Sequence, residues 1–340
     1  MVLKVRDVRL NSPNVNMVHC ANSGQINPLQ NPRYSTGGFV KNSAFAKINL
    51  FLAIAGRRND RYHEIVSVMQ SVGLCDELRF EIGNGSGEPV ELEIAPGIQQ
   101  SRPQNCNVLH AGADNLVVKA ANLFLKTYNI TTPVKIILDK HIPIGAGLGG
   151  GSSNAAATLQ GLNCLFGLNI PQEELATLGV QLGADVPFCI TGGTALATGI
   201  GEKLTPLVPH PPCHILLACP PVHVSTGEIF GMLKQPKLDS RILTKLEGFF
   251  TACNSKDVSQ IAQHLENIFT PITSVMHPQI TTLITDMKNH GALNASMTGT
   301  GATVFAYFEN EHTARQAYDI LQEKHKGVRF IQTETLNRKG

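Results

Sequence analysis

Apolar residues alternate with other residues in several segments after residue 42, and this period of two predicts β-strands. The clearest case is 48–54, where every second residue is Ile or Leu until a polar turn at 56–60. The stretch 63–72 fits either a strand or a helix, and the Gly- and Pro-rich stretch 83–103 predicts a hairpin and a loop. Further short apolar runs predict strands at 77–82, 134–138, 214–219, 303–308 and 328–332.

Other segments repeat their apolar residues at the spacing of one helix face, which predicts helices. Residues 114–128 show this spacing. A second helix is predicted to begin at 152–153, with one of these two serines as its cap and Gly167 as its stop. A third is predicted to begin near Pro171 and to end by Gly183. Further helices are predicted near residues 229, 259, 278 and 312.

Composition divides the chain into three parts. Residues 1–42 are rich in Asn and broken by Pro, Ser and Gly, so we expect a flexible extension, with a short strand at 2–8 as an open alternative. An organelle-targeting peptide is less favoured there, because Ser and Arg are few and no amphipathic helix is evident. Prolines and a loss of periodicity after 205 predict a boundary between domains at 43–205 and 206–340. Strands and helices mix without regular βα alternation, which predicts the α+β class.

The composition is that of a globular protein. Of 340 residues, 42% are hydrophobic and 16% are charged, and the formal net charge is +2. This balance argues against a surface that neutralises nucleic-acid phosphates. The eight cysteines include no C-x-x-C pair, which argues against a zinc knuckle or a disulfide framework. With no signal-peptide pattern and no apolar run near the ~18 residues that span a bilayer, we expect a cytoplasmic protein without a membrane partner.

The stretch 143–154 carries the strongest chemical signal in the sequence. Five of its residues are glycine, and it leads directly into the helix predicted at 152–153. Residues without side chains let the backbone approach phosphate oxygens, and the free N–H groups and dipole of a helix N-terminus add positive potential. We therefore interpret this stretch as an anion-binding loop.

Three known loops must be told apart, because Gly145, Gly147 and Gly150 satisfy the pattern G-x-G-x-x-G. A dinucleotide-binding loop follows its strand directly and needs an acid at a strand end about 20 residues later. Here residues 139–143 intervene after the strand. A Walker A loop needs a Lys after its last Gly, and a protein-kinase loop needs a trailing Val, and both are missing. A dinucleotide-dependent oxidoreductase is therefore a less favoured alternative.

The pattern Pro-x-x-x-Gly-Leu-Gly-Gly-Gly-Ser-Ser-Asn in 143–154 resembles the ATP-binding motif of the GHMP kinases. Residues 46–52 resemble the first motif of that family, and residues 297–302 resemble the third. The resemblance implies ATP and Mg²⁺ as cofactors. It also implies a two-domain α+β GHMP kinase fold, with a first domain like domain 2 of ribosomal protein S5 and a ferredoxin-like second domain.

Within this family, residues 46–50, 56–64 and 76–78 resemble the branch whose acceptor is a cytidylyl sugar alcohol. Arg61 stands where that branch usually has Gly. The resemblance implies ATP-dependent phosphorylation of the 2-hydroxyl of this small molecule, in non-mevalonate isoprenoid biosynthesis. Another GHMP small-molecule kinase, of the homoserine or mevalonate-pathway type, is the first alternative.

Two residues match the catalytic pair of the family. Asp185 lies between apolar neighbours, and Lys47 lies in an otherwise apolar strand. A tertiary alcohol is a poor nucleophile, so the resemblance implies that Asp185 takes the hydroxyl proton while Lys47 orients Asp185 and offsets charge. By residue type alone, Asp185 fits a turn or capping role and Lys47 fits an exposed strand edge.

The remaining site residues follow from the resemblance by position. The nucleotide is expected at Asn115, Lys140, Pro143, Gly145, Gly147, Leu148, Gly149, Gly150, Gly151, Ser152, Ser153 and Asn154. The acceptor is expected at Asn49, Tyr62, His63, Thr226 and Phe230, with the pyrimidine between the rings of Tyr62 and Phe230. A second loop beside the phosphates is expected at Gly299, Thr300 and Gly301, where a tight turn is an equally physical interpretation.

No Asp/Glu cluster in the sequence forms a metal cage. We therefore expect Mg²⁺ to be held by phosphates, water and a hydroxyl such as that of Ser152 or Ser153. The sequence leaves open whether the protein is a monomer or a homodimer.

Overall fold

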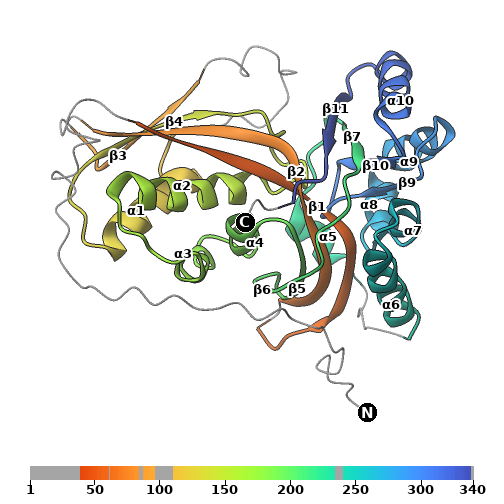
Figure 1. Ribbon diagram of the computed structural model, residues 1–340, viewed down its shortest axis with the longest axis horizontal. Helices are drawn as coiled ribbons and strands as arrows, with labels where there is room; N and C mark the ends of the chain where they lie inside the picture. The colour runs from red at the N-terminus through yellow and green to blue at the C-terminus, as the bar shows by residue number, and fades with distance from the viewer. Residues whose placement is uncertain (1–38, 61, 84–86, 96–109, 234–239, 338–340) are drawn as a thin grey trace.

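The computed structural model describes residues 39–60, 62–83, 87–95, 110–233 and 240–337 (Figure 1). The strand considered at 2–8 and Arg61 lie outside these ranges. Within them the chain forms two sheets with helices packed against both, which confirms the predicted α+β class (Figure 1). No helix in the described ranges is long and apolar enough to cross a membrane.

The larger sheet is built around two long antiparallel strands, β1 and β2. The pairing begins at Val40, which lies opposite Phe80 and precedes residue 43, the predicted start of the first domain. Strand β2 runs without interruption through 63–72 and 77–82, so 63–72 is a strand and not a helix. The strands of this sheet are β1 (Val40–Arg57), β2 (His63–Ile82), β3 (Val90–Ile94), β4 (Val134–Asp139), β5 (Thr194–Gly199), β6 (Lys203–Pro206) and β8 (Glu266–Asn267).

Two connections in this sheet differ from the expectation. Strand β3 runs parallel to β4, so within the described residues it does not form the hairpin predicted in 83–103. Strand β8 comes from the second predicted domain, yet it pairs in parallel with β1 of the first, with Asn267 opposite Leu52. The two halves of the chain therefore share one sheet.

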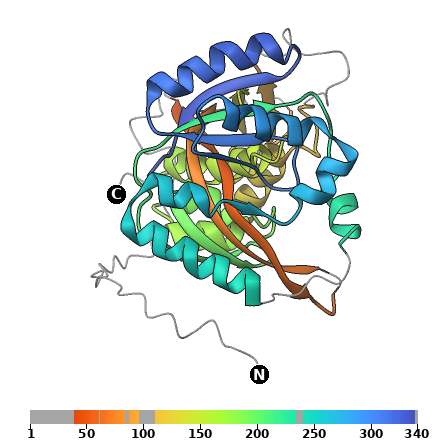
Figure 2. The same ribbon diagram turned by 90° about the vertical axis from the view of Figure 1, so that its right-hand side faces the viewer.

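The smaller sheet has the order β11-β7-β10-β9 and is antiparallel throughout. Alternate residues of β7 and β10 point to opposite sides. Leu216 and Ala306 pack with apolar residues of α9 and α10, whereas Leu217 and Phe305 pack with β1, α6 and α7. Helices thus cover the outer side of this sheet (Figure 2). Its strands are β7 (His214–Cys219), β9 (Asn294–Met297), β10 (Val304–Phe308) and β11 (Arg329–Glu334).

Helices α1 and α2 pack on one face of the larger sheet (Figure 1). Their apolar side chains meet those of β2 and β4, including Phe80 and Ile136. The helices are α1 (Leu116–Thr127), α2 (Gly150–Phe166), α3 (Gln172–Gly179), α4 (Val186–Thr191), α5 (Thr226–Gly231), α6 (Ser240–Ser255), α7 (Val258–Gln263), α8 (Thr270–Met276), α9 (Gln279–Asn289) and α10 (Glu311–Lys324).

The start of α2 corrects the sequence prediction. The helix begins at Gly150, and its N-cap is Gly149, which makes no side-chain capping bond. The Ser153 hydroxyl donates instead to the carbonyl of Phe45, 2.6 Å away. The predicted serine cap is therefore wrong, while the predicted stop at Gly167 is confirmed. Gly149 has φ +68°, in the left-handed region that favours glycine, so the local backbone and not a side chain sets the helix start.

Candidate active site

The glycine-rich loop lines a pocket of about 470 Å³, which we call the glycine-loop pocket. The N–H groups of Gly150, Gly151 and Ser152 donate to no acceptor among the described residues. Free N–H groups at the start of a 17-residue helix form an anion site. Every residue predicted for the nucleotide lines this pocket except Ser153, which is buried behind it.

The second glycine loop, from Thr298 to Gly301, packs directly against the first. A Cβ atom on Gly147 would lie 2.6 Å from the carbonyl oxygen of Thr298 and 3.0 Å from that of Gly301. Because both neighbours are backbone atoms, neither can move aside cheaply, and Gly147 also has φ +78°. The two loops therefore fit together only with glycine at this position.

A buried carboxylate beneath the glycine-rich loop was not among the predicted site residues. Asp76 has no exposed surface, and its Oδ1 accepts from the backbone N–H groups of His141 and Ile142 at 2.6 and 2.7 Å. Its Oδ2 accepts from Asn154 Nδ2 at 2.7 Å and from the ammonium of Lys140. Asp76 thus ties the segment after β4 to the first turns of α2.

The sequence contained a signal for Asp76. It occupies the same face of β2 as Leu78 and Phe80, which are buried in the core. An acid in an apolar face of a strand needs partners, because burying an unpaired charge is costly. That pattern was a reason to look for donors elsewhere in the chain.

Lys47 and Asp185 form the centre of the site. Lys47 Nζ lies 3.3 Å from Asp185 Oδ2 and 2.9 Å from Asn49 Oδ1. The Lys47 side chain is 6% exposed and that of Asp185 is 30% exposed, so the carboxylate has access to solvent or substrate. Asp185 is the N-cap residue of α4 but makes no side-chain capping bond, so its carboxylate is not used for capping.

Lys47 also touches the glycine-rich loop. Its backbone N–H donates to the carbonyl of Leu148 at 3.0 Å, and a Cβ on Gly149 would lie 2.9 Å from Lys47 Cγ. Lys47 is therefore no exposed edge residue. The loop and the lysine are fixed relative to one another by direct contact.

Asn49 lies beside Lys47 and is not among the residues that line the glycine-loop pocket. It is 2% exposed, and its Nδ2 donates to Ser67 Oγ at 2.8 Å. Its Oδ1 accepts from Lys47 Nζ, from the N–H of Gly299 at 3.0 Å and from the hydroxyl of Thr298 at 3.2 Å. These partners of the amide all lie within the protein, and the contact expected between Asn49 and the phosphoryl-acceptor substrate stays a prediction.

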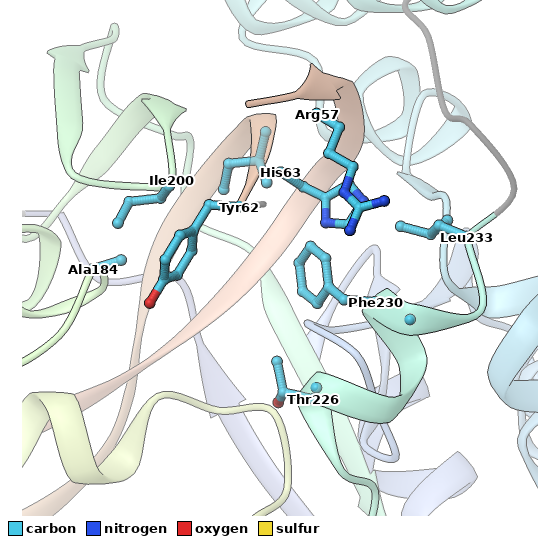
Figure 3. Close-up of a pocket in the computed structure, with 11 residues that line it drawn as sticks. Arg57, Tyr62, His63, Ala184, Ile200, Thr226, Phe230 and Leu233 are labelled. Atoms are coloured by element: carbon cyan, nitrogen blue, oxygen red, sulfur yellow. The ribbon is translucent and has the colours of Figure 1, made fainter. Parts of the chain in front are cut away.

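A second pocket of about 450 Å³, which we call the aromatic pocket, brings together four predicted acceptor residues (Figure 3). The ring of Phe230 packs against His63, 5.3 Å away, and against Phe269, 4.7 Å away. Tyr62 is 62% exposed and faces the pocket from the start of β2 (Figure 3). Thr226 Oγ1 lies 3.2 Å from Thr300 Oγ1, which connects the pocket to the second glycine loop.

Arg57 also lines the aromatic pocket and was not predicted (Figure 3). It lies directly opposite His63 in the β1–β2 pairing. Burial lowers the pKa of His63 below its ordinary value of 6.5, and the charge of Arg57 lowers it further. The His63 imidazole is therefore neutral at pH 7.

Two predicted nucleotide residues have structural partners of their own. Asn115 caps α1, where its side chain accepts from the N–H of Val117 at 2.9 Å. Lys140 is 4% exposed, and its ammonium is paired with Asp76. Both residues also line the glycine-loop pocket, where their binding to a nucleotide stays a prediction.

Comparison with known proteins gives consistent matches along the chain. The family model described as "GHMP kinases N terminal domain" matches residues 115–193, and "GHMP kinases C terminal" matches residues 249–327. The 4-diphosphocytidyl-2-C-methyl-D-erythritol kinase of Lachnospira eligens is 40% identical over 296 residues, which cover 87% of this chain and 98% of that protein.

Solved structures agree with these matches. A 4-(cytidine 5'-diphospho)-2C-methyl-D-erythritol kinase superposes with a TM-score of 0.67 at 27% identity, over 88% of this chain and all of that one. Homoserine kinase from Cytophaga hutchinsonii superposes with a TM-score of 0.68 at 21% identity, over 88% of this chain and 95% of that one. At that identity the second likeness shows a shared fold alone.

Proposed function

The chain belongs to the 4-diphosphocytidyl-2-C-methyl-D-erythritol kinases, a branch of the GHMP kinase family, and on this premise we propose its reaction. It transfers the γ-phosphoryl group of ATP to the 2-hydroxyl of 4-diphosphocytidyl-2-C-methyl-D-erythritol. The proposal is carried by the position of the Lys47–Asp185 pair. Lys47 contacts Gly149 of the glycine-loop pocket, and Asp185 follows Ala184 of the aromatic pocket, so the pair joins the two.

The nucleotide site supplies positive potential mainly from the backbone. The free N–H groups at the start of α2 receive phosphate oxygens, and the helix dipole favours their negative charge. Such a site needs few basic side chains, which agrees with a net charge of only +2. The tight contact between Gly147 and the second loop keeps this backbone surface rigid.

The Lys47–Asp185 pair acts on the hydroxyl and on the transferred group. Asp185 is the carboxylate at the junction of the pockets, and it accepts the proton of the attacking hydroxyl. Two contacts of the Lys47 ammonium, to Asp185 and to Asn49, fix its direction. Its charge then stabilises the oxygens of the migrating phosphoryl group.

Transfer from ATP implies Mg²⁺, and the donors present fit an ion held mainly by phosphates and water. The described residues contain no group of three His, Cys, Asp or Glu side chains that would bind a metal. Ser152 Oγ lies 3.7 Å from where a Cβ on Gly183 would stand, two residues before Asp185 in the chain, whereas the Ser153 hydroxyl is bound to the carbonyl of Phe45. We therefore assign Ser152 as the protein ligand. When bound, the ion neutralises phosphate charge.

The aromatic pocket holds the cytidine end of the acceptor. Tyr62 and Phe230 offer ring faces for the pyrimidine. A neutral His63 offers one N–H donor and one nitrogen acceptor. The edge of the cytosine ring has both an acceptor nitrogen and an amino group, so the two can hydrogen-bond.

A direct assay tests the proposed function. ADP release is measured with the cytidylyl substrate, homoserine and phosphomevalonate in parallel. Turnover of the cytidylyl substrate alone supports the proposal, and turnover of homoserine alone contradicts it. A thermal-shift response to NAD(H) without a response to ATP would instead favour the oxidoreductase alternative.

Phe230→Ala is expected to raise KM for the cytidylyl substrate by about 5- to 150-fold, equivalent to ~1–3 kcal/mol of lost stacking. KM for ATP stays near the wild-type value, because Phe230 does not line the glycine-loop pocket. Steady-state kinetics measure both constants. Phe250→Ala, on α6 and outside the aromatic pocket, is the matched control. An equal rise of both KM values would show that Phe230 is only structural.

We expect KM for the cytidylyl substrate to rise at acidic pH, with an inflection below the ordinary histidine pKa of 6.5. The lowered pKa of His63 keeps it neutral at higher pH, and protonation at low pH replaces its acceptor nitrogen with a second donor. Arg57→Gln removes a charge that lowers this pKa, so the inflection moves to higher pH. KM measured between pH 5 and 8 checks both shifts. An unchanged inflection in His63→Gln would assign the titration to another group.

A further inference from the structure

Asn267 is a buried polar residue to which neither the predicted site nor the mechanism above gives a role. It lies in β8, the two-residue strand that pairs with β1, and it is 5% exposed. Its Oδ1 accepts from the backbone N–H of Phe269 at 2.8 Å. Its Nδ2 donates to the carbonyls of Met297 at 2.7 Å and Gly299 at 2.9 Å.

A continuous series of hydrogen bonds leads from Asn267 to the centre of the site. Asn267 binds the carbonyl of Gly299, and Asn49 binds the N–H of the same glycine. The oxygen of Asn49 that accepts this N–H also accepts from Lys47 Nζ. Lys47 Nζ in turn lies 3.3 Å from Asp185 Oδ2. Gly299 is thus held on both sides by asparagines from the paired strands β1 and β8.

We propose that Asn267 is a positioning residue for phosphoryl transfer, which acts through Gly299 and Asn49 on the direction of the Lys47 ammonium. This inference rests on the proposed function. It adds a residue from the second half of the chain to the control of a lysine in the first.

The packing explains how a small displacement would reach Lys47. On its other side Gly299 faces the backbone of Gly147, whose carbonyl oxygen would lie 3.3 Å from a Cβ added to Gly299. Thr273 holds the next carbonyl, that of Thr300, at 3.0 Å. If the bond from Asn267 to Gly299 is lost and Gly299 shifts, its N–H moves away from Asn49 Oδ1. The Asn49 amide, which accepts a hydrogen bond from Lys47 Nζ, then reorients. A shift of about 1 Å in a reacting group costs up to ~10²-fold in rate.

Asn267→Asp is the first test, because it keeps the shape of the side chain and replaces the donor that faces two carbonyls with a carboxylate oxygen. We expect kcat to fall about 10- to 100-fold while KM for the cytidylyl substrate changes less than about twofold. The matched control is Asn294→Asp. Asn294 in β9 makes hydrogen bonds of the same kind. Its Nδ2 donates to the carbonyl of Ala262, and its Oδ1 accepts from the N–H of Ala295, but neither bond involves Lys47 or Gly299.

A double-mutant cycle separates positioning from general damage to the fold. In a Lys47→Ala background, Asn267→Asp should lower the residual kcat by less than about threefold, because the group that it positions is gone. An equal loss in both backgrounds, or an equal loss of kcat in Asn294→Asp, overturns the proposal. Asn267→Ser, which retains a donor without adding charge, is put through the same cycle if the aspartate variant unfolds.

The wild-type protein is first assayed with the cytidylyl substrate. Absence of turnover overturns both the proposed function and this inference. Normal turnover together with a wild-type kcat in Asn267→Asp overturns only the inference.

Discussion

Asp185→Asn is expected to lower kcat by about 10²- to 10⁴-fold, the usual contribution of a positioned general base. The amide keeps the size of the side chain but cannot accept the hydroxyl proton. It also removes the charge partner of Lys47, 3.3 Å away. KM for ATP should change little, because backbone N–H groups of the glycine-rich loop form most of that site.

Single-turnover measurements with rapid quenching give the rate of the chemical step, even where product release limits steady-state turnover. Asp319→Asn is the control. Asp319 is an exposed residue of α10, and within the described part of the chain its ion-pair partner is Arg315. A single-turnover rate for Asp185→Asn within about threefold of wild type would remove Asp185 as the base.

The elements with strong local patterns were predictable from the sequence. The alternation at 48–54 marks the buried centre of β1, and Gly167 ends α2 as its position indicates. The elements that were not predicted include helices α4, α6 and α8 and strands β5, β6, β8 and β9. Strand β8 has no periodicity to detect, because a two-residue strand exists only through its pairing with Phe51 and Leu52.

The start of α2 shows a different limit. A serine after a glycine run is a good cap by residue type, but the chain enters this helix through left-handed glycines, where the serine side chains are not in a capping position. Ser153 instead faces Phe45, which lies 108 residues earlier. The capping propensity of serine reflects only the neighbouring residues, whereas the hydrogen-bond partner of Ser153 lies far away in the sequence.

The chemistry of the site follows the same division. The loop at 143–154 was predictable because consecutive residues, a run of glycines and the helix that follows it, form the anion site. The hydrogen bonds of Asn49 were not predictable, because the partners of its amide oxygen include Thr298 and Gly299, about 250 residues away. The sequence predicts Asn49 as a ligand of the phosphoryl-acceptor substrate, and the structure adds that its amide oxygen supports the Lys47 ammonium.

Asp76→Asn is expected to lower the free energy of unfolding by about 3–5 kcal/mol, the usual cost of removing one partner of a buried ion pair. The carboxylate receives four donors, two on each oxygen, and an amide replaces one of these acceptors with an NH₂ group. In one orientation the new NH₂ group faces the backbone N–H groups of His141 and Ile142, and in the other it faces the Lys140 ammonium. The loss falls on the segment that joins β4 to the glycine-rich loop, so KM for ATP should also rise.

Urea unfolding followed by circular dichroism measures this loss. Glu77→Gln is the matched control, since Glu77 is the exposed neighbour of Asp76 in β2 and its change should stay within about 0.5 kcal/mol. Lys140→Met in the Asp76→Asn background tests the pairing itself. Because the single variant removes the carboxylate that pairs with the buried Lys140 ammonium, removing the lysine charge as well should recover part of the lost stability. Strict additivity of the two changes, or an effect of Asp76→Asn no larger than that of Glu77→Gln, would show that this carboxylate does not hold the loop.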